Sequence, residues 1–267
     1  MSPGEASVRQ EDEKEASPVV QLLAAPFSAL SFLTVLPVPV PGSSGRLSMG
    51  WAVAFFPLAG AFIGLCLAGL DRLLGPWFPP RVEAALLVAA LLAVTGALHL
   101  DGFMDSFDGV FGGKDPASRR AIMKDSRVGS FGIAAAVSAL LMEYGSLGSL
   151  PGEARLEALV LAVTLSRWAM VAILWLFPAA GSTGLAAGLK PRVRWVHAAV
   201  ATVLALAIAA AFPGWTGGIM VVLSGLMVLL AGRLMVAKLG GITGDSCGAV
   251  GQLVETLVLV ASVVLVR

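Results

Sequence analysis

The sequence predicts an all-α, polytopic transmembrane helical bundle. Of its 267 residues, 57% are hydrophobic and only 13% are charged, whereas soluble domains usually carry about 25% charged residues. Several apolar stretches reach the roughly 20 residues that a helix needs to cross the hydrocarbon core of a bilayer. Helices also satisfy their own backbone hydrogen bonds there. We therefore expect the chain to be surrounded by a lipid bilayer.

The N-terminal part divides into a polar tail and an apolar helix. Residues 1–17 are polar, mixed in charge and without an apolar face, which predicts a disordered tail and no signal peptide. Residues 18–267 are expected to form a single integral membrane domain. It begins with an apolar segment, Pro18 to Leu36, that contains Pro26 and is followed by PVPVP. This segment is typical of an interfacial or re-entrant helix rather than a span.

About seven spans follow, and the distribution of charge between them predicts the orientation. Thirteen of the 18 lysine and arginine residues fall on the side of the N-terminus, four fall on the opposite side, and Arg167 lies within a span. Positively charged loops stay in the cytoplasm, so the polar loops should converge on the cytoplasmic face and form one site there. The expected spans are 51–70, 82–100, 129–148, 156–178, 194–212, 215–236 and 250–266.

Three aspartates after the second span predict a metal site. Asp101, Asp105 and Asp108 are spaced i, i+4 and i+7, so they share one face if that span continues as a helix past His99. Carboxylates at the negative end of a helix are unfavourable unless a divalent cation offsets the charge. Oxygen ligands without thiolates favour Mg²⁺ or Mn²⁺ over zinc. The alternative is a solvated acidic helix end. Neighbouring glycines would let phosphates approach the backbone: Gly102, Gly109, Gly112 and Gly113.

A basic face is expected on the short cytoplasmic surface helix that comes next. Asp115 and Pro116 are typical of an N-cap and a first helical residue. Arg120, Lys124 and Arg127 then fall at i, i+4 and i+7. Cations beside a carboxylate cluster are the layout of metal-assisted phosphoryl transfer, in which the cations hold phosphate oxygens. The alternative is an amphipathic helix bound to anionic lipid headgroups.

Two further aspartates have alternative roles. Asp125 is either another metal ligand or an ion-pair partner of Arg120 or Arg127. Asp245 lies in the glycine-rich segment 240–255, where it could complete a second metal site, act as a base toward a hydroxyl nucleophile, or only cap the last helix.

Charged and polar residues inside the spans need partners. Glu255 and Arg167 both lie at membrane depth, and we expect them to pair with each other. His99 projects from a different helix face than Asp101, so we expect packing or hydrogen bonding there rather than metal binding.

Several motifs of this chain match one known family. The central ones run from His99-Leu-Asp-Gly through Asp105, Asp108-Gly109 and Phe-Gly-Gly-Lys114 to Arg119-Arg120 and Met-Lys-Asp-Ser-Arg-Val-Gly129. Outlying ones are Phe32-Leu-Thr-Val-Leu-Pro-Val-Pro and Gly-Gly-Ile-Thr-Gly-Asp245. Together they resemble the cobalamin synthase family, the adenosylcobinamide-GDP ribazoletransferases.

The resemblance implies a multi-pass enzyme of the cell inner membrane with its active site facing the cytoplasm. Such an enzyme transfers the cobinamide phosphate of adenosylcobinamide-GDP to the hydroxyl of α-ribazole or α-ribazole 5′-phosphate and releases GMP, with Mg²⁺ as cofactor. This reaction completes the nucleotide loop of vitamin B12. We expect no nucleic-acid partner, and homo-oligomerisation stays open.

Together with the chemistry of the charged segments, the resemblance gives each candidate residue a role. The expected metal ligands are Asp101, Asp105, Asp108 and Asp125. The expected catalytic residues are Asp105, Asp108, Asp245 and Lys124. The expected substrate-binding residues are Lys114, Arg119, Arg120, Arg127, Gly112 and Gly113.

Two rival functions are weaker. A CDP-alcohol phosphotransferase would carry an Ala-Arg pair shortly after its first Asp-Gly and wider gaps between its later aspartates, but Phe103-Met104-Asp105 stands here. An ion or vitamin transporter would place carboxylates near the middle of the membrane, whereas these aspartates follow a span and precede a basic segment.

Overall fold

The described chain is built from helices, as the sequence predicts. The computed structural model describes residues 17–41 and 49–265, and these ranges contain a single isolated β-bridge and no longer strand. Residues 1–16 of the predicted tail lie outside the described residues. In chain order the helices are α1 (Pro18–Leu33), α2 (Met49–Ala54), α3 (Phe56–Leu74), α4 (Pro80–Thr95), α5 (Leu98–Gly112), α6 (Pro116–Ile122), α7 (Ser130–Ser149), α8 (Gly152–Leu176), α9 (Leu185–Leu189), the 3₁₀ turn η1 (Lys190–Arg192), α10 (Trp195–Ala210), α11 (Thr216–Leu239) and α12 (Gly244–Leu265).

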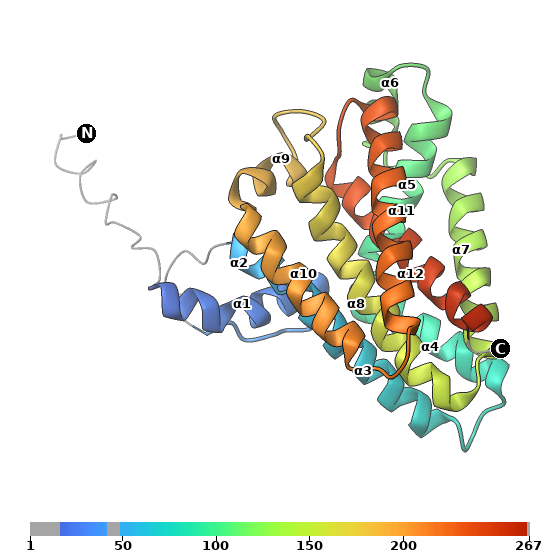
Figure 1. Ribbon diagram of the computed structural model, residues 1–267. Helices are drawn as coiled ribbons and strands as arrows, with labels where there is room; N and C mark the ends of the chain where they lie inside the picture. The colour runs from blue at the N-terminus through green and yellow to red at the C-terminus, as the bar shows by residue number, and fades with distance from the viewer. Residues whose placement is uncertain (1–16, 42–48, 266–267) are drawn as a thin grey trace, which may run out of the picture.

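The bundle is polytopic, with five to seven spans. Among the described residues, five helices are long and apolar enough to cross a membrane: α3, α7, α8, α11 and α12. Two bent pairs, α4 with α5 and α9–η1 with α10, bring the number to seven if each pair is one span. Helix α1 has 16 residues with Pro26 inside it, and it lies across one side of the bundle (Figure 1). The expected short N-terminal helix is confirmed, and its interfacial or re-entrant position stays a prediction.

Helical structure does continue past His99, so the three aspartates share one helix, but the predicted second span is not one straight helix. Helix α4 ends at Thr95, and α5 begins at Leu98 with its axis turned by 89°. Gly96 and Ala97 between them both adopt left-handed backbone conformations, with φ of 59° and 55°. The amide of Ala97 donates back to the Leu92 carbonyl and closes α4. Asp101, Asp105 and Asp108 therefore sit on a separate helix that crosses the end of α4.

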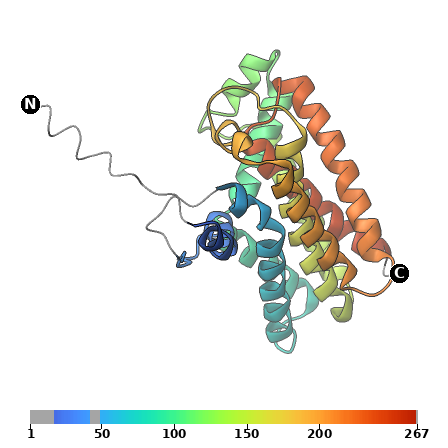
Figure 2. The ribbon, with the colours of Figure 1, turned by 60° about the vertical axis from the view of Figure 1, so that its left-hand side comes forward.

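Helix α12 lies in the middle of the bundle and packs on α5, α7, α8 and α11. Figure 2 shows it among the yellow α8 and orange α11 helices. The guanidinium of Arg167 on α8 pairs with Glu255 on α12, which confirms the predicted pair. On the α7 side, Glu143 accepts hydrogen bonds from Gln252 and from Thr256 of α12.

A second buried ion cluster lies at the opposite end of the bundle from α6. Arg155 of α8 pairs with Asp71 of α3 and with Glu83 of α4, and all three side chains are buried. The sequence analysis placed Arg155 in a loop, because it started the fourth span at residue 156; α8 in fact begins at Gly152. The cluster ties together three helix ends that meet there.

The bend between α4 and α5 generates a stability prediction. Ala97→Gly should stabilise the protein by up to about 1 kcal/mol, because alanine in the left-handed region costs roughly 1–2 kcal/mol and the flexibility of glycine in the unfolded chain offsets about half of that. Thermal unfolding in detergent, followed by circular dichroism, measures the change. The matched control Ala93→Gly, inside α4, should instead destabilise by about 1 kcal/mol. Equal losses for both variants would contradict a left-handed Ala97.

Candidate functional site

A cavity of about 340 Å³ lies at the end of the bundle where the polar loops meet. Its walls come from α5, the segment after α6, residues 179–189 and the start of α12, with Phe32 and Phe56 completing them. Four residues predicted from the sequence line it: Asp101, Arg120, Lys124 and Asp245. The separate polar segments do converge on one cavity, as predicted; that this cavity is the functional site stays a prediction.

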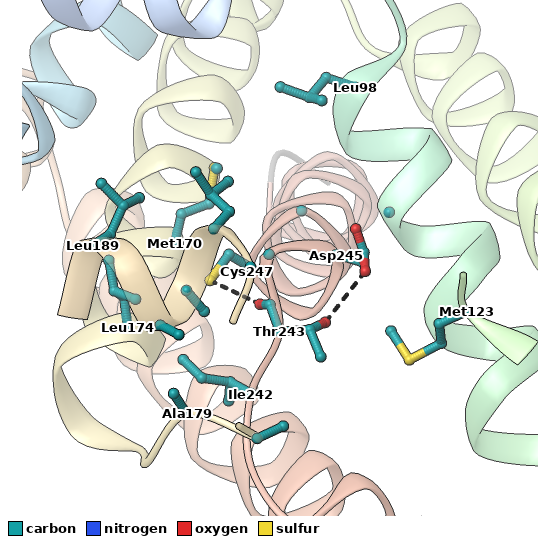
Figure 3. Close-up of a pocket in the computed structure, with 18 of the residues that line it drawn as sticks. Leu98, Met123, Met170, Leu174, Ala179, Leu189, Ile242, Thr243, Asp245 and Cys247 are labelled. Carbon is teal, nitrogen blue, oxygen red and sulfur yellow. Dashed lines mark hydrogen bonds between the residues drawn. The ribbon is translucent and has the colours of Figure 1, made fainter. Parts of the chain in front are cut away.

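Asp245 lies in the first turn of α12, with its side chain toward the cavity (Figure 3). It is not the helix cap, because Thr243 and Ser246 form a capping box in which each hydroxyl accepts the other's backbone N–H at 3.1 Å. Asp245 accepts a 3.4 Å hydrogen bond from the Thr243 hydroxyl. A carboxylate in the first turn is also favoured by the helix dipole. Asp245 is thus held in place while most of its acceptor capacity stays free.

Close packing of α5 on α12 brings the predicted carboxylates together. A Cβ atom on Gly102 would lie 2.9 Å from the backbone oxygen of Asp245, so only glycine permits this approach. Asp105 is repelled by Asp101 and Asp108 of its own helix and, through this packing, by Asp245. Within the described ranges, no salt bridge neutralises Asp101, Asp105 or Asp245. The result is an excess of negative charge beside the cavity.

Asp108 has a role that the sequence analysis did not foresee. Its two carboxylate oxygens accept 2.8 Å hydrogen bonds from the backbone amides of Gly129 and Gly132, at the N-terminus of α7. A Cβ on either glycine would come within 2.5 Å of this carboxylate. Asp108 therefore caps α7 from a neighbouring helix and is buried. Its assignment as a metal ligand or catalytic residue stays a prediction.

The predicted basic face is not formed by one helix. Helix α6 ends at Ile122, so Lys124 and Arg127 lie beyond it. Arg119 donates to the Lys238 carbonyl at 3.2 Å, and Arg120 donates to the Leu239 carbonyl. These carbonyls belong to the last turn of α11, where cations are favoured. Of the predicted cations, Arg120 and Lys124 line the cavity.

The remaining predicted residues lie around the cavity rather than in its lining. Asp125 pairs with Arg127 at 2.8 Å, the second of the alternatives left open for it. Hydrogen bonds from Arg127 lower the pKa of Asp125 to about 2, and both side chains are exposed. Gly113 packs against the backbone of Arg119, while Gly112 and Lys114 are exposed.

No three histidine, cysteine or acidic side chains of the described ranges are arranged to hold a metal ion. The chemistry of the free donors nevertheless fits a hard divalent cation, because Asp101, Asp105 and Asp245 offer carboxylate oxygens whose charge is unpaired within the described chain. Asp108 and Asp125 fit less well, since their oxygens already accept hydrogen bonds.

Sequence reasoning missed part of the cavity lining. His99 lines the cavity and is only 4% exposed, yet its Nε2 atom has no hydrogen-bond partner in the described part of the chain. Apolar side chains from four helices form another part of the lining, and apart from Phe32, which begins one of the family motifs, no local motif marks them. They are Phe32, Phe56, Met170, Leu174 and Leu189.

Comparisons with known proteins agree on one family. The sequence model of a family described as cobalamin-5-phosphate synthase matches residues 25–263. Three relatives are each named adenosylcobinamide-GDP ribazoletransferase. The one from Stutzerimonas stutzeri (strain A1501) is 39% identical and covers 87% of this chain and 94% of the relative. That from Roseiflexus sp. (strain RS-1) is 36% identical and covers 86% of each. That from Geotalea daltonii is 36% identical, over 89% of this chain and 96% of the relative. No solved structure matches the chain.

The position of Asp108 predicts a loss of stability on substitution. Asp108→Asn should destabilise the protein by about 1.5–3 kcal/mol, because asparagine has one acceptor oxygen for two amides and loses the charge that strengthens both bonds. The melting temperature in detergent measures the effect. Asp115→Asn is the matched control: Asp115 caps α6, and asparagine caps equally well, so its melting temperature should not change. An unchanged melting temperature with lost activity in Asp108→Asn would instead favour a catalytic role.

Proposed function

Because this chain belongs to the cobalamin-5-phosphate synthase family, we propose that it completes the nucleotide loop of cobalamin. It transfers the cobinamide phosphate of adenosylcobinamide-GDP to a ribose hydroxyl of α-ribazole or α-ribazole 5′-phosphate and releases GMP. The observation that carries this proposal is one cavity in which two carboxylates, Asp101 and Asp245, meet two cations, Arg120 and Lys124. Phosphoryl transfer needs both kinds of charge close together.

Asp245 is the proposed general base. It lines the cavity, and the Thr243 hydroxyl donates a long hydrogen bond of 3.4 Å to its carboxylate, so it can accept the proton of the acceptor hydroxyl. The hydroxyl oxygen then bonds to the phosphorus next to the cobinamide arm, and the bond from that phosphorus to the bridging oxygen of GMP breaks. GMP leaves with the bridging oxygen. The attack is direct and in line, without a covalent enzyme intermediate.

Arg120 and Lys124 are the proposed phosphate ligands. Both line the cavity, and a fixed cation stabilises the negative charge that moves onto the departing GMP. Arg120 is oriented by its hydrogen bond to the end of α11, which lowers the entropy cost of holding a phosphate. Lys114 and Arg127 are exposed nearby on the same side of the bundle and attract the anionic substrate over a longer range. Arg119 acts by holding α6 against α11.

Mg²⁺ is the proposed cofactor, and Asp101 and Asp105 would hold it, although the described side chains are not arranged around a metal ion. When bound, it supplies charge neutralisation for the pyrophosphate. The mutual repulsion of these carboxylates, without an ion pair in the described chain, supports this assignment.

The cavity is proposed to face the cytoplasm from the cell inner membrane. Many cations lie at the cavity end of the bundle, among them Lys114, Lys124, Arg127, Lys190 and Arg192. Arg72 and Arg81 lie at the other end, around the connection of α3 to α4. This asymmetry supports a cytoplasmic position for the cavity end.

Purified protein should release GMP from adenosylcobinamide-GDP when α-ribazole is supplied, and chelation of divalent cations should stop the release. Chromatographic detection of GMP and cobalamin measures the reaction. Accumulation of the vitamin precursor in proteoliposomes without GMP release would replace the proposal with transport.

Asp105→Asn should lower kcat by about 100-fold or more, in the range expected for the loss of one preorganised electrostatic group. It removes a charge and almost no volume, so membrane insertion should persist. The matched control is Glu153→Gln, an exposed carboxylate at the far end of α8, and its kcat should equal that of the wild type. Near-normal turnover of Asp105→Asn would rule out a role for Asp105 in metal binding.

A further inference from the structure

We propose that the apolar interior of the cavity binds the aromatic base of the acceptor nucleoside and sets the specificity for that base. The inference rests on the proposed function and deepens it. The base of α-ribazole is a dimethylated benzimidazole, which is a flat bicyclic ring with an apolar edge. The corrin of the donor stays outside the cavity, and the donor's pyrophosphate lies beside Arg120 and Lys124, at the charged mouth of the cavity.

The two sides of the cavity differ in chemistry. Asp245 lies on one side, while the side chains of Met170, Leu174 and Leu189 face the cavity from the other (Figure 3). Phe32 and Phe56 add aromatic surface, and their rings stack with centroids 5.5 Å apart. A ligand that fits both sides has a polar, hydroxylated part and an apolar ring, and a nucleoside with an apolar base is such a ligand. Methionine and aromatic side chains also suit an aromatic ligand.

The volume of the cavity decides which of the two substrates can enter it. At about 340 Å³ it lies at the lower end of the roughly 300–1,000 Å³ found for small-molecule sites. This volume suits one nucleoside. A corrin macrocycle with its side chains is far bulkier than a nucleoside and does not fit inside together with the GDP arm. The acceptor is therefore the substrate that enters the interior.

His99 offers the base a hydrogen-bonding partner. The side chain is 4% exposed and lines the cavity, and its Nε2 lacks a partner in the described ranges. Buried polar atoms are rarely left unpaired; Nε2 is enclosed in the structure, so a ligand atom would pair with it after a turn of the imidazole ring toward the cavity. The benzimidazole ring of α-ribazole carries one unsubstituted nitrogen, and that nitrogen can accept a hydrogen bond from Nε2–H.

The segment that follows α8 along the cavity is hydrogen-bonded to the segment that precedes Asp245, the proposed base. Residues 179–180 bridge to Ile242: the Ala180 amide donates to the Ile242 carbonyl at 2.9 Å, and the Ile242 amide donates to Pro178 at 2.8 Å. Asp245 follows three residues later at the start of α12. Base recognition and proton abstraction are thereby held at a fixed separation, as a positioned attack requires.

Filling the interior tests the inference directly. Ala187 is half-buried and lines the cavity, so Ala187→Leu should raise the Kd for α-ribazole tenfold or more while leaving the Kd for adenosylcobinamide-GDP unchanged. Calorimetric titration of the full-length protein in nanodiscs, with each substrate alone, measures both constants. The matched control Ala207→Leu, on the exposed face of α10, should change neither.

A smaller base should rescue the filled variant. Ala187→Leu should bind the nucleoside of unmethylated benzimidazole better than α-ribazole, reversing the wild-type order, because leucine occupies the space of the methyl groups. His99→Leu should weaken α-ribazole binding severalfold without such a reversal.

The outcomes separate this inference from the proposed function. If the wild type binds α-ribazole and Ala187→Leu loses that binding, the inference stands even if no GMP is released. If the wild type releases GMP but Ala187→Leu binds α-ribazole normally, or weakens only the donor, the inference is overturned and the proposed function stands. A wild type that does not bind α-ribazole overturns the inference.

Discussion

The position of α12 depends on buried polar contacts. Helices in a bilayer gain little from hydrophobic association, so packing and polar contacts between them decide their register. Arg167 holds Glu255 from α8, while Glu143 on α7 accepts from Gln252 and Thr256. Asp245 is ten residues before Glu255 on the same helix, about 15 Å along its axis. A shift of α12 would break the ion pair inside the bundle, which is strongly unfavourable, so the pair fixes the depth of Asp245.

Helix α5 is then positioned against this fixed helix from two directions. Gly102 allows its backbone to touch Asp245 on α12, and Asp108 caps α7 on its other side. Both contacts restrict rotation of α5 about its axis. With that rotation set, Asp101 and Asp105 must lie near Asp245 despite their repulsion. The packing of α5 against α12 and α7 therefore offsets the electrostatic repulsion among the carboxylates at the site.

Those features of the fold and the site that depend on composition and local sequence pattern could be predicted from the sequence. Hydropathy predicted the helical bundle, and charge at membrane depth predicted the pair of Arg167 with Glu255. Topology predicted that four charged residues would meet at one end: Asp101, Arg120, Lys124 and Asp245. The bend after α4 could not be predicted, because alanine rarely adopts a left-handed conformation. Tertiary contact contributes there: the Val35 amide bonds to the Val94 carbonyl next to the bend. Most of the apolar wall of the cavity could not be predicted either, since Phe56, Met170 and Leu174 come from distant helices with ordinary core patterns.

The gradient of polarity within the cavity explains why a membrane bundle suits this chemistry. Charged phosphates cannot enter the apolar interior without a large desolvation cost, so they stay near Arg120 and Lys124 at the mouth. An apolar base gains by leaving water for the space beside Met170 and Leu174. In the binding mode proposed above, the nucleoside enters base first, and its ribose lies between the two regions, next to Asp245. In that binding mode, solvation alone would orient the acceptor before any specific contact to the ribose forms.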